Sequence, residues 1–155
     1  MRILVLSDAH GRTAPVEQAI ERSQPEILLF LGDGLRELQY LQELYPNIIF
    51  HVVKGNCDFT DAPATQLLQI GGKRIFMTHG HLYGVKYSYE TAIAAAEKAG
   101  ADLLLFGHTH IAYQDYQNGL YILNPGSVAF PRSGKPSYGH VDIVNRQIIT
   151  NIVYF

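Results

Sequence analysis

Residues 2–10 read RILVLSDAH, in which an unbroken β-favouring run ends in an Asp-x-His motif. A continuous apolar run of this kind is typical of a strand buried on both faces. The same pattern, an apolar run followed directly by polar residues, recurs farther along the chain. The later clusters are Gly32-Asp33, Gly55-Asn56-Cys57-Asp58, His79-Gly80-His81 and Gly107-His108-Thr109-His110. Together they indicate that polar side chains from distant segments meet beyond the ends of several strands.

The N-terminal half has the pattern of parallel strands joined by helices. The expected strands are residues 3–6, 27–31 and 48–53. Thr13 and Pro15 are typical of a helix start, with Thr13 as the N-cap. Leucines recur at helical spacing over residues 35–44 and predict a second helix. This β-α-β-α-β order favours parallel strands with right-handed crossovers.

The C-terminal half is expected to be mainly β. The turn signals Gly71-Gly72, Asn118-Gly119 and Asn145-Arg146 each stand between two strand-like runs and predict three hairpins. Between the first two hairpins, an alanine-rich helix is expected over residues 88–99 and a buried strand over residues 103–106.

Composition limits the class of protein. The chain has 155 residues, 47% of them hydrophobic, and a formal net charge of −2. This size predicts one domain, residues 1–155, with a core of its own. The chain has no basic tract that would favour nucleic-acid binding. It also has no stretch that approaches the roughly 20 apolar residues of a membrane span. A single cysteine excludes an intrachain disulfide and fits a reducing compartment, so we expect a cytoplasmic protein.

The polar clusters are expected to converge because each follows a predicted strand. Asp8 follows the first strand, Asp33 the second and Asn56 the third, while His79 and His108 follow two later strands. In open α/β sheets, ligands bind beyond the carboxyl ends of the strands. The sequence therefore predicts one shared site for all five clusters.

The candidate metal ligands offer oxygen or imidazole nitrogen and no thiolate. They are Asp8, His10, Asp33, Asn56, His79, His108 and His110. This set suits Mn²⁺, Fe, Zn²⁺, Co²⁺ or Ni²⁺, and mixed ligation does not choose among them. We expect two divalent ions, with Mn²⁺ as the first candidate. Asp33 is the best candidate for a bridging carboxylate because it stands alone in its cluster.

The Asp-x-His and His-x-His spacings leave two arrangements open. In an extended backbone, residues two apart point the same way, so Asp8 and His10, or His108 and His110, would face one ion. In a turn, the two members of a pair would reach different ions. Either way, two divalent ions beside two carboxylates leave a charge of about +2, which favours a bound hydroxide and an anionic substrate.

These clusters, in this order from Asp8 to about Ser127, resemble the calcineurin-like metallophosphoesterase superfamily, and most of all its small prokaryotic phosphodiesterase branch. The resemblance implies a four-layer α/β/β/α sandwich of two mixed sheets. It also implies phosphodiester hydrolysis by a hydroxide that the two ions activate. The implied ligand sets are Asp8, His10, Asp33 and His110 for one ion, and Asp33, Asn56, His79 and His108 for the other. The segment from Asn124 to Ser127 resembles a late loop of the family near the site.

Cys57 departs from the resemblance, because much of the superfamily has histidine there. That histidine is usually assigned to transition-state stabilisation or leaving-group protonation. A thiol is a weak hydrogen-bond donor, so we expect slow hydrolysis of esters with poor leaving groups. The alternative for Cys57 is simple buried packing.

Four residues are candidates for catalytic roles beside or beyond metal binding: Asn56, Cys57, Asp58 and His81. Asp58 either orients a ligand or caps a turn. His81 either contacts a substrate phosphate or caps its loop.

Two further functions fit the same residues. A phosphomonoesterase would differ only in substrate, and it would need positive residues to neutralise a dianionic phosphate. A non-catalytic interaction scaffold would share the fold and is known in the superfamily with part of the ligand set lost. The sequence leaves open the natural substrate, the native metal, the leaving-group proton donor and whether the chain forms a homo-oligomer.

Overall fold

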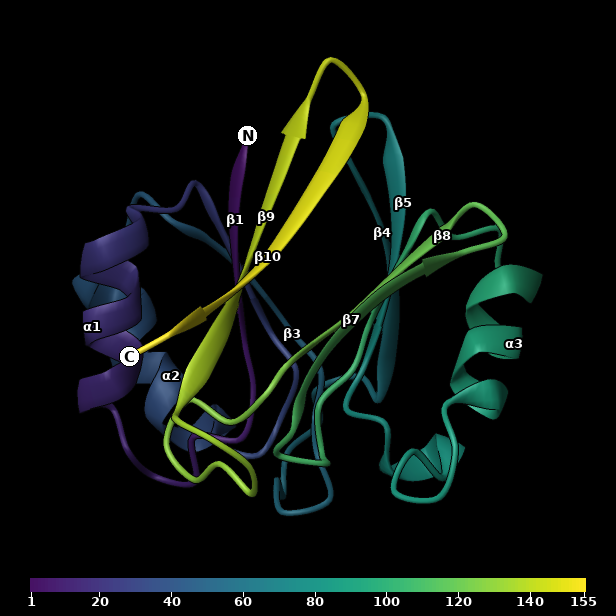
Figure 1. The fold of residues 1–155 in the computed structure, drawn as a ribbon. Coiled ribbons are helices and arrows are strands. Elements are labelled where there is room, and N and C mark those ends of the chain that lie inside the picture. Colours follow the sequence, from purple (N-terminus) through teal and green to yellow (C-terminus); the bar gives the residue numbers. More distant parts are fainter.

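Two five-stranded sheets lie face to face, with helices on both outer faces (Figure 1). The computed structural model describes residues 1–155. Helices α1 (Ala14–Ser23) and α2 (Leu35–Leu44) cover one sheet, and α3 (Glu90–Lys98) covers the other. Because each sheet contains both parallel and antiparallel pairs, this is the expected four-layer α/β/β/α sandwich of two mixed sheets.

The first sheet contains the predicted β-α-β-α-β unit. Its strands, in spatial order, are β10 (Gln147–Tyr154), β9 (Ser137–Val144), β1 (Arg2–Leu6), β2 (Ile27–Phe30) and β3 (Ile49–Val52). Strands β1, β2 and β3 are parallel neighbours, so their carboxyl ends lie at one edge. The C-terminal strand β9 pairs antiparallel with β1, and this pairing brings the end of the chain back to its start.

The second sheet is built from two hairpins and a central strand. In spatial order it contains β4 (Thr65–Ile70), β5 (Lys73–Thr78), β6 (Leu103–Leu105), β8 (Leu120–Pro125) and β7 (Ala112–Gln117). Strands β5, β6 and β8 are parallel, whereas β4 and β7 pair antiparallel at the edges. All three predicted hairpin turns are confirmed, and each has two consecutive residues with positive φ, as type I′ turns require.

Alternation along the buried strands explains their unbroken apolar sequences. Ile3 and Val5 face the core between the two sheets, whereas Leu4 and Leu6 pack in a separate core beneath α1 and α2. Residues 3–6 of β1 are therefore buried on both faces of the sheet, where an unpaired polar side chain would be costly. A third core lies between the second sheet and α3.

Two local features differ from the sequence expectation. Thr13 occupies the N-cap position of α1, but its backbone is already helical and its side chain makes no capping hydrogen bond. A short 3₁₀ helix, η1 (His81–Tyr83), follows β5 and was not predicted. No helix in the structure has the length and apolar character needed to cross a membrane.

Truncating a side chain in the core between the sheets tests this packing. Leu29 on β2 is fully buried there, so Leu29→Ala should lower the free energy of unfolding by about 2–5 kcal/mol in urea denaturation. Leu67→Ala on edge strand β4, where the side chain is 43% exposed, is the matched control and should cost much less. Equal losses in the two variants would contradict the proposed core.

Candidate metal centre

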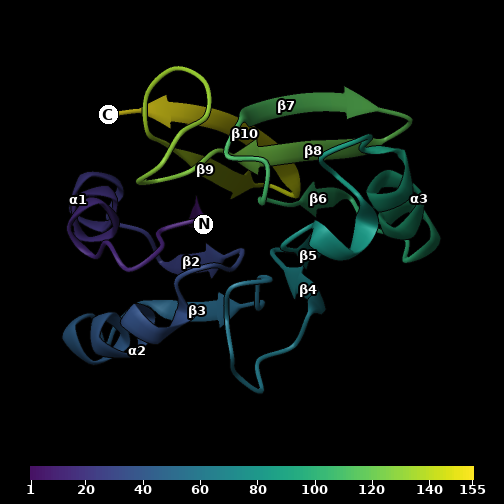
Figure 2. The ribbon, with the colours of Figure 1, turned by 90° about the horizontal axis from the view of Figure 1, so that it is seen from below.

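The loops that follow β1, β2, β5 and β6 meet at one edge of the sandwich. This edge lies at the bottom of Figure 1 and faces the viewer in Figure 2. Backbone hydrogen bonds connect the loops, from Asp8 N–H to the Gly32 carbonyl (3.0 Å) and from Gly107 N–H to the His79 carbonyl (2.9 Å). Between the two sheets, His108 N–H donates to Asp8 Oδ2 (3.0 Å), and His79 Nδ1 lies 2.7 Å from the Leu31 carbonyl. The two sheets therefore contribute to a single site, as the polar clusters predicted.

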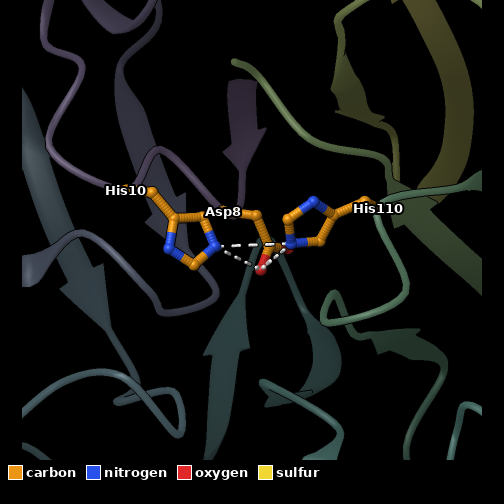
Figure 3. A group of neighbouring side chains, drawn as sticks. All are labelled: Asp8, His10 and His110. Carbon is orange, nitrogen blue, oxygen red and sulfur yellow. Dashed lines mark hydrogen bonds and ion pairs between the residues drawn. The ribbon is translucent and has the colours of Figure 1, made fainter. Parts of the chain in front are cut away.

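Asp8, His10 and His110 form the first cluster of candidate ligands (Figure 3). His110 Nε2 lies 3.2 Å from Asp8 Oδ1 and 3.3 Å from His10 Nε2. His110 Nδ1 donates to the Phe130 carbonyl at 2.6 Å, which leaves the Nε2 lone pair facing the cluster. A carbonyl partner of this kind commonly fixes the tautomer of a metal-binding histidine.

Asp33, Asn56, His79 and His108 form the second cluster around His79 Nε2. This nitrogen lies 3.1 Å from Asn56 Oδ1, 3.1 Å from His108 Nδ1 and 3.3 Å from Asp33 Oδ2. His79 Nδ1 donates to the Leu31 carbonyl at 2.7 Å. As in the first cluster, the backbone orients the ring so that the other nitrogen faces inward.

Asp33 lies between the two clusters. Its Oδ2 is 3.3 Å from His79 Nε2 and 3.7 Å from His10 Nε2, whereas Oδ1 accepts a hydrogen bond from Cys57 N–H at 2.8 Å. One oxygen is thus held by the backbone and the other faces both clusters. This is the geometry expected of a carboxylate shared by two ions.

Asp8 provides the clearest indication of a missing partner. Its Oδ2 accepts hydrogen bonds from the Ser7 hydroxyl (2.6 Å) and from His108 N–H (3.0 Å). Its Oδ1 is buried, faces the first cluster and has no hydrogen-bond partner. A buried carboxylate oxygen without a partner is costly, and a bound cation would satisfy it. The oxygen and nitrogen donors of the site therefore fit divalent transition metals.

The pKa shifts of the candidate ligands also indicate that the site favours positive charge. Burial opposes ionisation of Asp33, but the hydrogen bond and charge of His79 hold the pKa of Asp33 well below its usual range. Burial also opposes protonation of His79, yet the Asp33 hydrogen bond and the Asp8 charge raise the pKa of His79. Burial and the His79 charge lower the pKa of His108 to about 4, so His108 is neutral at pH 7. The pKa shifts of Asp33 and His79 thus favour positive charge beside these carboxylates, which a bound cation would supply.

The backbone at the ligands is left-handed, which resolves the two arrangements that the spacings left open. Positive φ angles occur at Asp8 (59°), His10 (43°), Asp33 (59°), His108 (69°) and His110 (58°). Non-glycine residues rarely adopt this conformation, and it concentrates at functional sites. Both Asp-x-His and His-x-His form turns. Asp8 and His10 still face the same cluster, whereas His108 and His110 face different ones.

Asp58 holds the two loops that carry Asp33 and Asn56 against each other. Its carboxylate accepts backbone N–H groups from Asp33 (2.7 Å), Gly34 (3.0 Å), Leu35 (3.1 Å) and Gly55 (2.8 Å). The bonds to Gly34 and Leu35 cap α2 from a distant segment, and a negative charge there also favours the helix dipole. Both oxygens are occupied, so Asp58 contacts the candidate ligands only through backbone.

Cys57 and His81 flank the clusters on different sides. Cys57 is exposed, and its Sγ groups with the ligand atoms of His10 and Asp33, so the expectation of buried packing is wrong. Partial desolvation and the Asp33 charge raise the pKa of Cys57, which keeps the thiol protonated at pH 7. The His81 ring lies 5.4 Å from His79, and its Nδ1 is buried without a hydrogen-bond partner. His81 Nδ1 therefore caps no loop.

The late loop from Asn124 to Ser127 lies beside the site, as the resemblance implied, although its individual contacts were not predicted. Ser127 Oγ donates to the Asp8 carbonyl (2.7 Å) and Asn124 Nδ2 to the Gly107 carbonyl (3.1 Å), which places the late loop directly behind the site. Gly55 and Gly107 do not have positive φ. They are needed because a Cβ would collide with the Asp33 carboxylate or the Ser7 hydroxyl. The sequence signal for this close packing is that both glycines adjoin candidate ligands, Asn56 and His108.

Comparison with known proteins identifies the family. A model described as the calcineurin-like phosphoesterase superfamily domain matches residues 1–146. The chain belongs to this superfamily. It is 39% identical to the probable metallophosphoesterase YsnB of Bacillus subtilis, over 85% of this chain and 78% of YsnB. It is 31% identical to phosphodiesterase YfcE of Escherichia coli, over 92% of this chain and 88% of YfcE.

A solved structure supports the same assignment. The crystal structure of a predicted phosphoesterase from Streptococcus pneumoniae matches with a TM-score of 0.83 and 28% identity, covering 99% of this chain and 88% of that chain. The predicted resemblance to small prokaryotic calcineurin-like phosphoesterases is therefore confirmed.

Asp58→Asn tests whether the backbone clamp controls the metal centre of this phosphoesterase. The amide places an N–H₂ group against backbone donors, so the Asp33 and Asn56 loops should loosen. We expect Mn²⁺ affinity in calorimetric titration to fall roughly 10–100-fold, as for other partners of metal ligands. Asp61→Asn, an exposed carboxylate in the same loop, is the control. An unchanged Mn²⁺ affinity in Asp58→Asn would contradict the clamp.

Proposed function

We propose that this chain is a phosphodiesterase that requires two divalent metal ions. The observation that carries the proposal is the position of Asp33 Oδ2, which faces both clusters of candidate ligands. The first ion would be held by Asp8, His10, Asp33 and His110, and the second by Asp33, Asn56, His79 and His108. Mn²⁺ is our first candidate, and Ni²⁺, Co²⁺, Zn²⁺ or Fe are alternatives that the same oxygen and imidazole donors suit.

The protein's own groups favour metal-assisted chemistry over a protein base. Asp58 is engaged by four backbone donors, and one oxygen each of Asp8 and Asp33 is likewise occupied. The remaining oxygens, Asp8 Oδ1 and Asp33 Oδ2, face the ring nitrogens of His110 and His79, where a bound cation would engage them. Divalent ions, when bound, lower the pKa of coordinated water and stabilise charge on phosphoryl oxygens. The chain would orient the ions through the rings of His79 and His110, which hydrogen bonds to backbone carbonyls hold in place.

The choice of a diester rests on charge and on one relative. Two divalent ions beside Asp8 and Asp33 would leave about +2, and a hydroxide would lower this to about +1, which a monoanionic diester balances. The relative YfcE is named a phosphodiesterase. We therefore propose a small phosphodiester as the substrate.

Cys57 supports a preference for activated esters. Its thiol stays protonated because desolvation and the Asp33 charge raise its pKa, but a thiol donates only weakly to a departing oxygen. A leaving group that is stable as an anion needs no such help. Phenolate-like leaving groups should therefore depart faster than alkoxides.

A panel of substrates and metals tests the proposed activity. Metal-stripped protein should hydrolyse bis(p-nitrophenyl) phosphate only after Mn²⁺, Ni²⁺, Co²⁺ or Zn²⁺ is restored, with p-nitrophenyl phosphate as the monoester comparison. Faster turnover of the monoester would replace the proposal with a phosphomonoesterase. No hydrolysis with any of these metals would favour a non-catalytic scaffold.

Asp33→Asn tests the shared ligand. Replacing the carboxylate should lower metal occupancy, measured by elemental analysis, together with the rate of diester hydrolysis. The loss of rate should exceed the roughly 10–100-fold loss that is typical when a residue that only hydrogen-bonds to a metal ligand is replaced. Asp115→Asn on the exposed face of β7 is the control. Unchanged occupancy in Asp33→Asn would count decisively against this ligand scheme.

Cys57→His tests the weak-donor explanation. An imidazolium donates a stronger hydrogen bond than a thiol, so hydrolysis of an alkyl diester should rise by roughly 100-fold or more, the lower end of the contribution of general acid catalysis. An aryl diester should gain much less. Metal content and circular dichroism establish that the variant folds and binds ions. Equal gains on both esters, or none on the alkyl ester, would show that the thiol does not limit leaving-group departure.

A further inference from the structure

A cleft of about 660 Å³ opens beside the first cluster of candidate ligands. Its lining contains His10 and Asp33 together with the first turns of α2 and the loop after Gly55, which contributes Cys57 and Phe59. A phosphoryl group placed at the clusters would therefore project one of its two ester substituents into this cleft. The volume accommodates a drug-sized group.

Phe59 in this cleft has a fully exposed ring. Its relative exposure is 100%, the highest among the large exposed apolar side chains. Its neighbours are nonetheless well anchored. Asp58 accepts four backbone hydrogen bonds, and the Thr60 hydroxyl accepts Ala62 N–H at 3.1 Å. The ring is thus presented to solvent by an ordered turn, as a binding surface for a flat group would be.

The charges of the cleft indicate an uncharged polar substituent. Arg36 and Glu37 both line it, and neither forms an ion pair. One free cation and one free anion give no net attraction for a second phosphate. They do offer a planar set of donors and a pair of acceptor oxygens for the edge of a polar ring. Gln39 adds an amide to the same lining.

We propose that this cleft binds the nucleoside portion of a nucleoside phosphodiester, with the base stacked on Phe59 and its polar edge hydrogen-bonded by Arg36 or Glu37. Stacking on an aromatic side chain tolerates any base, because every base has a π-face. The cleft would therefore select nucleosides over simple alkyl groups without selecting one base strongly. This inference deepens the proposed phosphodiesterase function and rests on it.

Two esters with the same leaving group test the cleft by kinetics. Thymidine 5′-(p-nitrophenyl phosphate) and methyl p-nitrophenyl phosphate both release p-nitrophenolate, so they differ only in the retained substituent. Phe59→Ala should raise KM for the thymidine ester by roughly 5- to 100-fold, the range contributed by base stacking, and leave the methyl ester unchanged. Tyr87→Ala, which removes a ring 96% exposed but outside the cleft, is the matched control. Equal effects of Phe59→Ala on both esters, or none on either, would overturn the proposal.

A binding measurement separates this inference from the proposed activity. The chain contains no tryptophan, so Phe59→Trp introduces a single tryptophan into the cleft, whose emission can be excited selectively over that of the ten tyrosines. Thymidine 5′-(methyl phosphate), an alkyl diester, should quench its emission, whereas dimethyl phosphate should not. Quenching by the thymidine diester alone supports the cleft even if no ester is hydrolysed, an outcome that would refute only the phosphodiesterase function. No quenching, or equal quenching by both diesters, overturns the cleft.

Discussion

A buried carboxylate oxygen needs a donor or a cation beside it, and in this fold two such oxygens face the same space. Asp8 and Asp33 each use one oxygen to accept hydrogen bonds from backbone or hydroxyl donors. The remaining oxygens lie among imidazole nitrogens and the Asn56 amide, and Asp8 Oδ1 has no hydrogen-bond partner. The site is therefore electrostatically incomplete without added positive charge. Burial of the His79 ring opposes its protonation, yet the Asp33 hydrogen bond and the Asp8 charge raise its pKa.

The rest of the sandwich keeps this arrangement in place. Left-handed backbone at a non-glycine residue costs on the order of 1–3 kcal/mol, and five candidate ligands have it. Such conformations persist only where the surroundings over-determine them. Here the dry core between the sheets fixes the strands, and hydrogen bonds such as His10 N–H to the Asp33 carbonyl (2.9 Å) fix the loops. The four bonds of Asp58 add the contact between Asp33 and the Asn56 loop.

The reacting centre and the cleft beside it differ in construction. The candidate ligands Asp8, Asp33 and His79 are almost fully buried and have their rings or oxygens fixed by backbone groups. Phe59 and Arg36, in contrast, present exposed side chains from a capped turn and a helix. The residues that would bind the ions are thus rigid and buried, whereas the residues that would contact the rest of the substrate are exposed. Substrate preference could then change without altering the ligands. Members of one superfamily can then differ in substrate while the ligand set is kept.

Local patterns in the sequence determined much of this protein. Apolar runs, turn pairs such as Asn118-Gly119 and the polar clusters fixed the strands, the hairpins and the seven candidate ligands, because strand period and turn chemistry act over a few residues. Periodicity alone did not show the second sheet, which the family resemblance supplied. The resemblance also supplied the split of His108 and His110 between two ligand sets. Only the tertiary structure decided that Asp8 Oδ2 accepts His108 N–H, that Asp58 binds three distant amides besides that of Gly55, and that Phe59 lines a cleft beside His10. Those features depend on side chains and backbone turns meeting across up to 100 residues of chain, as between Asp8 and His108, and no short-range signal encodes such meetings.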